Sequence, residues 1–251
     1  MILLTNDDGF NAPGLRALRS AICEVAEAVI VAPETEQSAV GHAITLALPL
    51  KVRKVEENGE FLGYAVNGTP ADCVKIAVTD LLEEPPELVI SGINRGGNLG
   101  TCVIYSGTVS AATEAAIMGF PAMAISLNAF ANPDFSAAAA FARKFAPMIV
   151  AKGLPQGISL NVNVPGVSER EIRGVAVTRQ GKSRVVETFD KRIDPRNNVY
   201  YWMAGEMKFE EVEEGTDSEM VSKNYISITP IHYDLTHLKF IDQLKEWDIR
   251  F

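Results

Sequence analysis

Short apolar segments alternate with helix-like segments along the first half of the chain, and this alternation restricts the possible folds more than any other feature. Apolar runs of strand length occupy residues 2–4, 28–33, 88–92 and 122–127. The segments between them have helical periodicity or a composition that favours helices. Strands that alternate with helices form βαβ units, so the pattern predicts an α/β fold with a mostly parallel sheet covered on both faces.

Three of the expected helices have recognisable signals. Thr69 and Pro70 are typical of a helix N-terminus and predict a helix over residues 71–82. An alanine-rich segment favours another over residues 109–118. Pro13 suits the first turn of a third, whose apolar face is expected to comprise Leu15, Leu18, Ile22 and Val25.

The second half of the chain is more charged and richer in strand-forming residues. Residues 179–196 hold six basic and three acidic side chains, and residues 206–219 hold seven acidic side chains and one basic one. Such segments rarely pack into a core, so residues 180–222 are predicted to form a projecting arm or a flexible hairpin.

Two parts are therefore expected. Residues 1–180 would form an α/β core that carries the functional site, ending with a helix over 136–152 and a strand over 158–164. Residues 181–251 would form a β-rich projecting arm and a C-terminal helix, and this part would return to the core in part. The expected elements of that return are a strand over 225–228 and an amphipathic helix over 235–247.

Charge and cysteine content exclude several classes of protein. The 251-residue chain has a formal net charge of −9, which argues against a general binder of nucleic acids or anionic membranes. Its three cysteines are scattered, and no signal peptide precedes the first strand. We therefore expect a cytoplasmic protein with no stable nucleic-acid partner and no membrane contact.

Polar side chains follow three of the predicted strands where each strand ends. Asp7 and Asp8 follow the first strand, Ser38 lies in the loop after the second, and Asn94 follows the third. The carboxyl ends of parallel strands share one edge of the sheet, which is where ligands bind. Oxygen ligands with two carboxylates suit Mg²⁺, Mn²⁺ or Ca²⁺ rather than zinc. The alternative is that these are ordinary turn and loop residues.

A glycine-rich run over residues 91–100 leads to Ser106, Gly107 and Thr108, which open the alanine-rich helix. Backbone N–H groups at a helix N-terminus form a ready site for a phosphate, and the two hydroxyls add donors. The alternative is that Thr108 only caps the helix and Gly107 only shapes a turn.

Other catalytic and nucleotide signatures are absent. No G-x-G-x-x-G follows the first strand, and Ala176 stands where a P-loop ending at Gly181-Lys182-Ser183 requires glycine. No G-x-S-x-G elbow supports a serine hydrolase. His42 lies close to Ser38 in sequence and is interpreted as a loop or packing residue.

Several motifs stand in order along nearly the whole chain, namely TNDDGFNAPG (5–14), GTPADCV (68–74), SGINRG (91–96), YSGTVSAA (105–112) and SITP (227–230). Ala32-Pro33 with Ser38 belongs to the same set. Together these motifs resemble those of the stationary-phase survival protein SurE family of nucleotidases.

The resemblance implies a Rossmann-like, three-layer α/β/α fold and a metal-dependent 5′-nucleotidase, a phosphoric monoester hydrolase. Nucleoside 5′-monophosphates would be hydrolysed to nucleoside and phosphate, with 3′-nucleotides and polyphosphate as further candidate substrates. It also implies homodimers or homotetramers that exchange their C-terminal arms. Three positions depart from the family pattern, namely Ala39, Cys102 and Ala115.

One divalent ion per subunit, Mg²⁺ or Mn²⁺, is expected. Its ligands, carried over by motif, are Asp7, Asp8, Ser38 and Asn94. A water activated by this metal would attack the phosphate, and a covalent aspartyl-phosphate on Asp7 is the competing mechanism. Asp7, Asp8, Asn94 and Ser106 are the expected catalytic residues, and Ser106, Gly107 and Thr108 would bind the phosphate.

Base recognition and two other functions remain open. Tyr105, or the arm residues Tyr200, Tyr201 and Trp202, could stack on a purine, although the arm aromatics suit oligomer contacts equally well. A nucleotide-binding regulator would use the same site without turnover. An RNA-binding module would use the basic segment 179–196.

Overall fold

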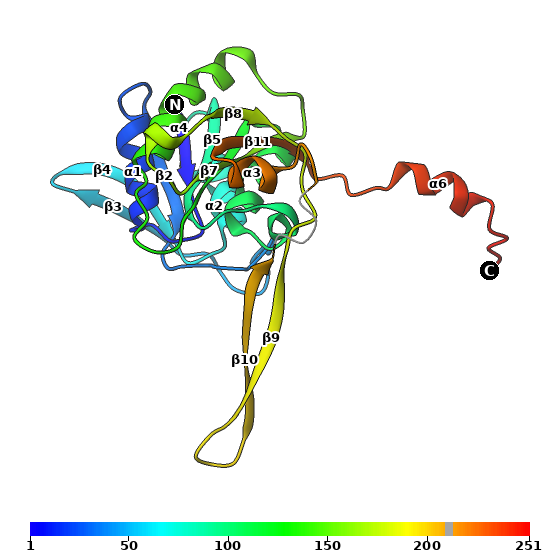
Figure 1. Cartoon of the computed structure of the whole chain (residues 1–251). Coiled ribbons are helices and arrows are strands. Elements are labelled where there is room, and N and C mark those ends of the chain that lie inside the picture. Colours follow the sequence, from blue (N-terminus) through cyan, green and yellow to red (C-terminus); the bar gives the residue numbers. More distant parts are fainter. Residues whose placement is uncertain (209–212) are drawn as a thin grey trace.

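The computed structural model describes residues 1–208 and 213–251, and its centre is a nine-stranded sheet (Figure 1). Six adjacent strands are parallel to one another, whereas the first strand and the last two run in the opposite direction. The predicted α/β class and mostly parallel sheet are confirmed. In sheet order the strands are β3 (Val52–Glu57), β4 (Glu60–Val66), β2 (Ala28–Pro33), β1 (Ile2–Thr5), β5 (Leu88–Arg95), β6 (Ala122–Asn128), β7 (Ile158–Pro165), β11 (Tyr225–His232) and β8 (Gly174–Val177).

Helices cover both faces of the sheet and give the three layers that were expected. Successive strand side chains point to opposite faces, so Leu4 packs in the core that contains α1 and α4, and Leu3 in the core that contains α2 and α3. The bounds of these elements are α1 (Pro13–Ile22), α2 (Pro70–Ile76) with the π-helical η1 (Ala77–Leu81), α3 (Gly107–Ile117) and α4 (Ser136–Lys152). Two 3₁₀ turns, η2 (Gly100–Ile104) and η3 (Glu169–Glu171), complete this part.

The helix start signals behave as expected, and one helix is shorter than predicted. Thr69 and Asp72 form a capping box at the start of α2, with Pro70 in its first turn. Helix α1 ends at Ile22, so Val25 lies beyond it and is exposed rather than on its apolar face.

The C-terminal β-rich arm is a hairpin formed by β9 (Arg184–Ile193) and β10 (Val199–Lys208). Among the described residues these strands pair only with each other, and they extend away from the core (Figure 1). The projecting part is shorter than the predicted 180–222, because α5 (Asp217–Ser222) packs against β11 and β7. Residues 209–212, part of the predicted acidic segment, lie outside the described residues.

Acidic residues of α5 are buried because the local backbone satisfies them. The buried Asp217 carboxylate accepts hydrogen bonds from the N–H groups of Gly100 and Gly181, at 2.9 and 2.8 Å. Glu219 accepts from Gly215 N–H at 2.7 Å and pairs with Lys223. The prediction from acidic composition therefore made the projecting arm too long at its C-terminal end.

The chain ends with α6 (Leu238–Lys245), which lies away from the sheet at the end of an extended segment (Figure 1). Its apolar side chains, including Leu238 and Phe240, are exposed. In the described part of the chain, every helix is too short or too polar to cross a bilayer.

Candidate active site

The carboxyl ends of three adjacent parallel strands, β2, β1 and β5, bring the predicted residues to one edge of the sheet. Backbone hydrogen bonds draw the loop after β2 over this edge. Gln37 N–H donates to the Asp7 carbonyl at 2.7 Å, and Gly41 N–H donates to the Tyr105 carbonyl at 3.0 Å. Ser38 therefore lies in a loop held between the end of β1 and the segment that leads into α3.

Asp7 lies against the first turn of α3. Its side chain is buried, with 6% of the residue exposed, and its Oδ1 accepts a hydrogen bond from the Thr108 hydroxyl. A Cβ at position 107 would lie 2.7 Å from Asp7 Cβ, so only glycine fits there. Burial raises the pKa of Asp7 to about 6, despite hydrogen bonds from Thr108 that lower it, and the charge of Asp8 raises it further.

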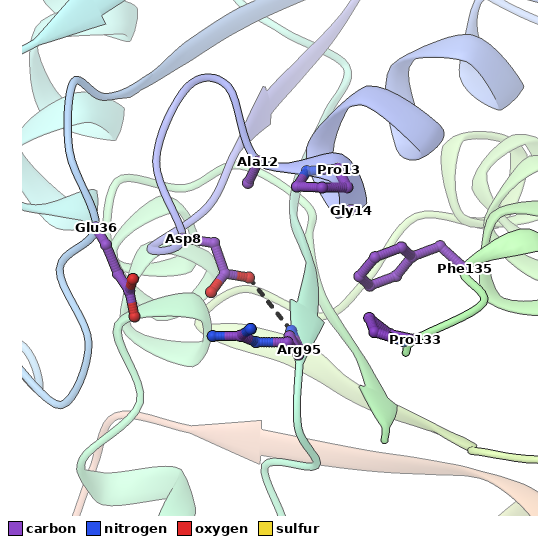
Figure 2. A pocket seen from close by; sticks show the side chains of 8 residues that line it. All are labelled: Asp8, Ala12, Pro13, Gly14, Glu36, Arg95, Pro133 and Phe135. Carbon is purple, nitrogen blue, oxygen red and sulfur yellow. Dashed lines mark hydrogen bonds between the residues drawn. The ribbon is translucent and has the colours of Figure 1, made fainter. Parts of the chain in front are cut away.

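Asp8 is more exposed to solvent than Asp7, and its carboxylate contacts the end of β5 rather than α3. Its Oδ2 accepts a hydrogen bond from the Arg95 backbone N–H at 3.2 Å, drawn as the dashed line in Figure 2. Burial raises the pKa of Asp8, and the charge of Glu36 adds to this effect, while Arg95 lowers it. Both aspartates therefore carry negative charge that the protein compensates only in part.

Ser38 and Asn94 have different partners in the structure. The Ser38 hydroxyl donates to Glu36 Oε1 at 2.6 Å. Asn94 Nδ2 donates to the Gly96 carbonyl at 2.7 Å, and this hydrogen bond fixes the orientation of the amide. The Asn94 Oδ1 atom is the oxygen that this side chain could offer to a cation.

The phosphate-binding residues that were predicted form the start of α3. Ser106 is the N-cap, and its Oγ accepts a hydrogen bond from Val109 N–H at 3.1 Å. The alternative in which Thr108 caps the helix is wrong, since its hydroxyl is directed to Asp7. Gly107 and Thr108 occupy the first turn, where N–H groups and the helix dipole favour an anion.

The residues at this edge fit a hard divalent cation. They offer carboxylate, hydroxyl and amide oxygens, and two carboxylates with raised pKa values gain most from a nearby positive charge. Within residues 1–208 and 213–251, no three His, Cys, Asp or Glu side chains are grouped so that they could hold a metal. The ligand set of Asp7, Asp8, Ser38 and Asn94 stays a prediction.

The loop that follows Ser38 is fastened to α2 and α3. His42 Nε2 lies 2.7 Å from Glu114 Oε2, and Lys75 pairs with the other oxygen of this buried carboxylate. His42 is thus a packing residue, as interpreted from the sequence. Ala39, one of the three departures from the family pattern, adopts a φ of +56°, a conformation that favours glycine.

A cavity of about 340 Å³ adjoins Asp8 and was not predicted from the sequence (Figure 2). Phe135, at the start of α4, lies far from the motifs along the chain, and only the tertiary fold brings it here. The lining residues are Asp8, Ala12, Pro13, Gly14, Glu36, Arg95, Pro133 and Phe135.

Basic residues of the segment considered for RNA binding are engaged within the chain. Arg179 and Lys182 lie 2.6 and 2.9 Å from the carboxylate oxygens of Glu213. This pairing reduces the positive charge that an RNA backbone would meet.

Comparison with known proteins gives consistent matches. A family model described as "Survival protein SurE" matches residues 2–187. A relative named "5'-nucleotidase SurE" from Syntrophobacter fumaroxidans is 54% identical over 248 residues, which cover 99% of this chain and 99% of the relative. Another of that name, from Syntrophus aciditrophicus, is 55% identical over 244 residues, covering 97% of this chain and 92% of the relative.

A solved structure described as that of the SurE protein from Aquifex aeolicus has the same architecture. The TM-score is 0.86 at 43% sequence identity, and the match covers 97% of this chain and 98% of that one. The similarity therefore extends through the core and into the C-terminal part.

Proposed function

The chain belongs to the survival protein SurE family, and we propose that it is a metal-dependent 5′-nucleotidase. It would hydrolyse nucleoside 5′-monophosphates to nucleoside and phosphate. The names of its close relatives support this activity. The observation that carries the proposal is the contact between Asp7 and the first turn of α3. This contact lies between a carboxylate suited to a cation and a helix N-terminus suited to an anion.

Catalysis of phosphoryl transfer depends mainly on positioning and charge neutralisation. The Ser106 hydroxyl and the N–H groups of Gly107 and Thr108 would hold phosphate oxygens. Asp7, Asp8, Ser38 and Asn94 would hold one divalent ion per subunit, Mg²⁺ or Mn²⁺. When bound, this ion supplies charge neutralisation and makes water a better nucleophile.

Asp8 is the better candidate to receive the proton of the attacking water. It is less buried than Asp7, and its carboxylate faces the cavity shown in Figure 2. Asp7 is held by Thr108 and is better suited to a fixed role. The competing mechanism, a covalent phosphate on Asp7, predicts an acid-stable and base-labile phosphoprotein in rapid-quench experiments with labelled substrate.

We further propose that the arm and α6 make contacts between copies of this chain, in a dimer or a tetramer. One face of the hairpin carries exposed apolar side chains from cross-strand pairs, including Met203 opposite Phe189 and Val199 opposite Ile193. A two-stranded hairpin alone is marginally stable in water. A partner subunit would cover this face.

A cytoplasmic location fits the scattered cysteines of the chain.

The direct test is phosphate release from nucleoside 5′-monophosphates, 3′-nucleotides and polyphosphate by metal-stripped protein, before and after addition of Mg²⁺ or Mn²⁺. Asp8→Asn should abolish the metal-restored turnover, whereas Asp80→Asn, a change at an exposed aspartate on η1, should leave it intact. Absence of turnover in folded wild-type protein with every metal would favour a non-catalytic nucleotide-binding regulator.

A further inference from the structure

The cavity beside Asp8 combines an apolar wall with a polar one. Figure 2 shows the Phe135 ring and Pro133 on one side, and Asp8 with the Arg95 side chain on the other. Glu36 faces Asp8 and Arg95 from the loop that carries Ser38. Asp8, a predicted metal ligand, lines the cavity, so the cavity adjoins the proposed metal site.

The apolar wall is held in place by close packing. A Cβ at Gly14 would lie 2.0 Å from the Ile93 carbonyl oxygen and 3.1 Å from Phe135 Cε1. Gly14 therefore lets the first turn of α1 approach both β5 and the Phe135 ring. Pro13, in the same turn, lines the cavity. The Phe135 ring is thus packed against the first turn of α1 and the core.

The dimensions and chemistry of the cavity restrict what it can bind. Its volume of about 340 Å³ is at the lower end of the range for small-molecule sites. A flat ring would pack on Phe135, and the guanidinium of Arg95 offers donors to ring or hydroxyl oxygens. The Glu36 carboxylate offers acceptors to hydroxyl groups. An aromatic base joined to a sugar has a flat ring for Phe135, oxygen atoms for Arg95 and hydroxyl groups for Glu36.

We propose that this cavity binds the nucleoside half of the substrate, with the base against Phe135 and the sugar near Arg95 and Glu36. The proposal rests on the proposed function, and adds to it the place where the nucleoside is recognised. It assigns the base to Phe135 rather than to Tyr105 or the arm aromatics.

Substrates with and without a base test the proposal. Base stacking on an aromatic side chain corresponds to about 5- to 100-fold in affinity. Phe135→Ala should therefore lower kcat/KM for adenosine 5′-monophosphate by about that factor and leave kcat/KM for ribose 5-phosphate unchanged. The quantity to compare is the ratio of kcat/KM for adenosine 5′-monophosphate to kcat/KM for ribose 5-phosphate. Phe135→Leu, which keeps an apolar side chain but removes the ring, should lower this ratio if Phe135→Ala does not fold.

Two control variants make the result specific. Phe141→Ala removes a ring from the same helix outside the cavity and should not change the ratio. Tyr105→Ala should not change it either. The proposal is overturned if the ratio is unchanged in both Phe135 variants, if both substrates lose equally, or if the loss follows Tyr105.

A binding measurement separates failure of this proposal from failure of the proposed function. Saturation-transfer NMR of adenosine with metal-free protein should detect binding to the wild type and to Phe141→Ala, and a loss of at least about 5-fold in Phe135→Leu. If no variant hydrolyses any phosphomonoester while this pattern holds, the proposed function fails and the nucleoside site stands. Absence of adenosine binding to the wild type overturns the nucleoside site.

Discussion

The Thr108 hydroxyl donates a hydrogen bond to Asp7 Oδ1, joining the first turn of α3 to the end of β1 across 101 residues of sequence. The bond fixes one carboxylate oxygen against the helix N-terminus. Because Asp7 is buried, hydrogen bonds from the Thr108 hydroxyl and from the backbone offset part of the cost of its charge. Thr108 therefore influences how readily Asp7 is ionised, and the proposed metal site requires the ionised form.

Replacing Thr108 by valine should weaken metal binding. The side chain keeps its shape but loses the donor, so the pKa of Asp7 should rise further and the ionised carboxylate should be less available. A hydrogen bond to a charged group contributes about 1.5–3 kcal/mol, which corresponds to about a 10- to 100-fold loss of Mn²⁺ affinity at neutral pH. Titration calorimetry would measure it. Thr108→Ser, which retains the hydroxyl, should bind almost as the wild type does, and equal affinity in Thr108→Val would contradict the prediction.

Asp7→Asn should stabilise the metal-free protein, although it removes a predicted metal ligand. The folded-state pKa of about 6 lies above the ordinary value of 3.8, so the folded state binds this proton more tightly than the unfolded state does. Stability from this group is fully present below pH 3.8 and is lost as the pH rises to about 6. The difference corresponds to about 3 kcal/mol at pH 7.5.

Urea unfolding in the presence of a chelator, from pH 4 to pH 8, would test this pH dependence. The free energy of unfolding of Asp7→Asn should exceed that of the wild type by a margin that grows between pH 4 and about 6 and is constant above. The exposed change Asp80→Asn should run parallel to the wild type. A margin independent of pH would show that Asp7 does not titrate as its burial implies.

The sequence predicted which residues share this edge of the sheet better than it predicted their interactions. Asp7, Asp8 and Asn94 could be predicted because each follows an apolar run that had to be a strand of one parallel sheet. Thr108 was predicted to contact phosphate, and its bond to Asp7 depends on the packing of α3 over β5 and β6, which only the tertiary fold supplies. The cavity wall formed by Phe135 and Pro133 could not be predicted, since no motif near these residues in the sequence indicates a binding site.

The fold shows the same division between local pattern and tertiary context. Apolar runs such as residues 88–92 predicted the central strands because these are buried on both faces. The edge strand β3 contains Arg53, Lys54, Glu56 and Glu57, and it was missed because an exposed edge strand lacks that apolar signature. Similarly, Asp217 is buried through hydrogen bonds to residues that composition cannot reveal.

Glu114→Gln should loosen the loop that carries Ser38. Burial alone would raise the pKa of Glu114, but hydrogen bonds from His42 and Lys75 outweigh it and hold the pKa below its ordinary value of 4.5. The folded state therefore binds this proton more weakly, and the stabilisation is present above pH 4.5 and lost as the pH falls below it. We expect a loss of roughly 1–3 kcal/mol at pH 7 and faster proteolysis between residues 38 and 50.

A matched change at an exposed carboxylate provides the control. Glu87 pairs with the N-terminal amine of Met1 at the surface, so Glu87→Gln should alter neither stability by more than about 0.5 kcal/mol nor the proteolysis pattern. Limited proteolysis followed by mass spectrometry would locate the cleavage sites. If the loop in Glu114→Gln is cleaved no faster than in Glu87→Gln, Glu114 does not fasten it.

Replacing residues 185–207 by a Gly-Ser-Gly linker should disrupt the proposed dimer or tetramer without unfolding the core. In the part of the chain that the structure describes, the hairpin pairs with no strand of the central sheet, and its removal spares α5 and β11. The apolar face formed by Phe189, Ile193, Val199 and Met203 would no longer be available to a partner subunit. Light scattering should report a lower mass than for the wild type, while circular dichroism reports an intact α/β core. An unchanged mass would assign the subunit contacts to other surfaces, with α6 as the next segment to remove.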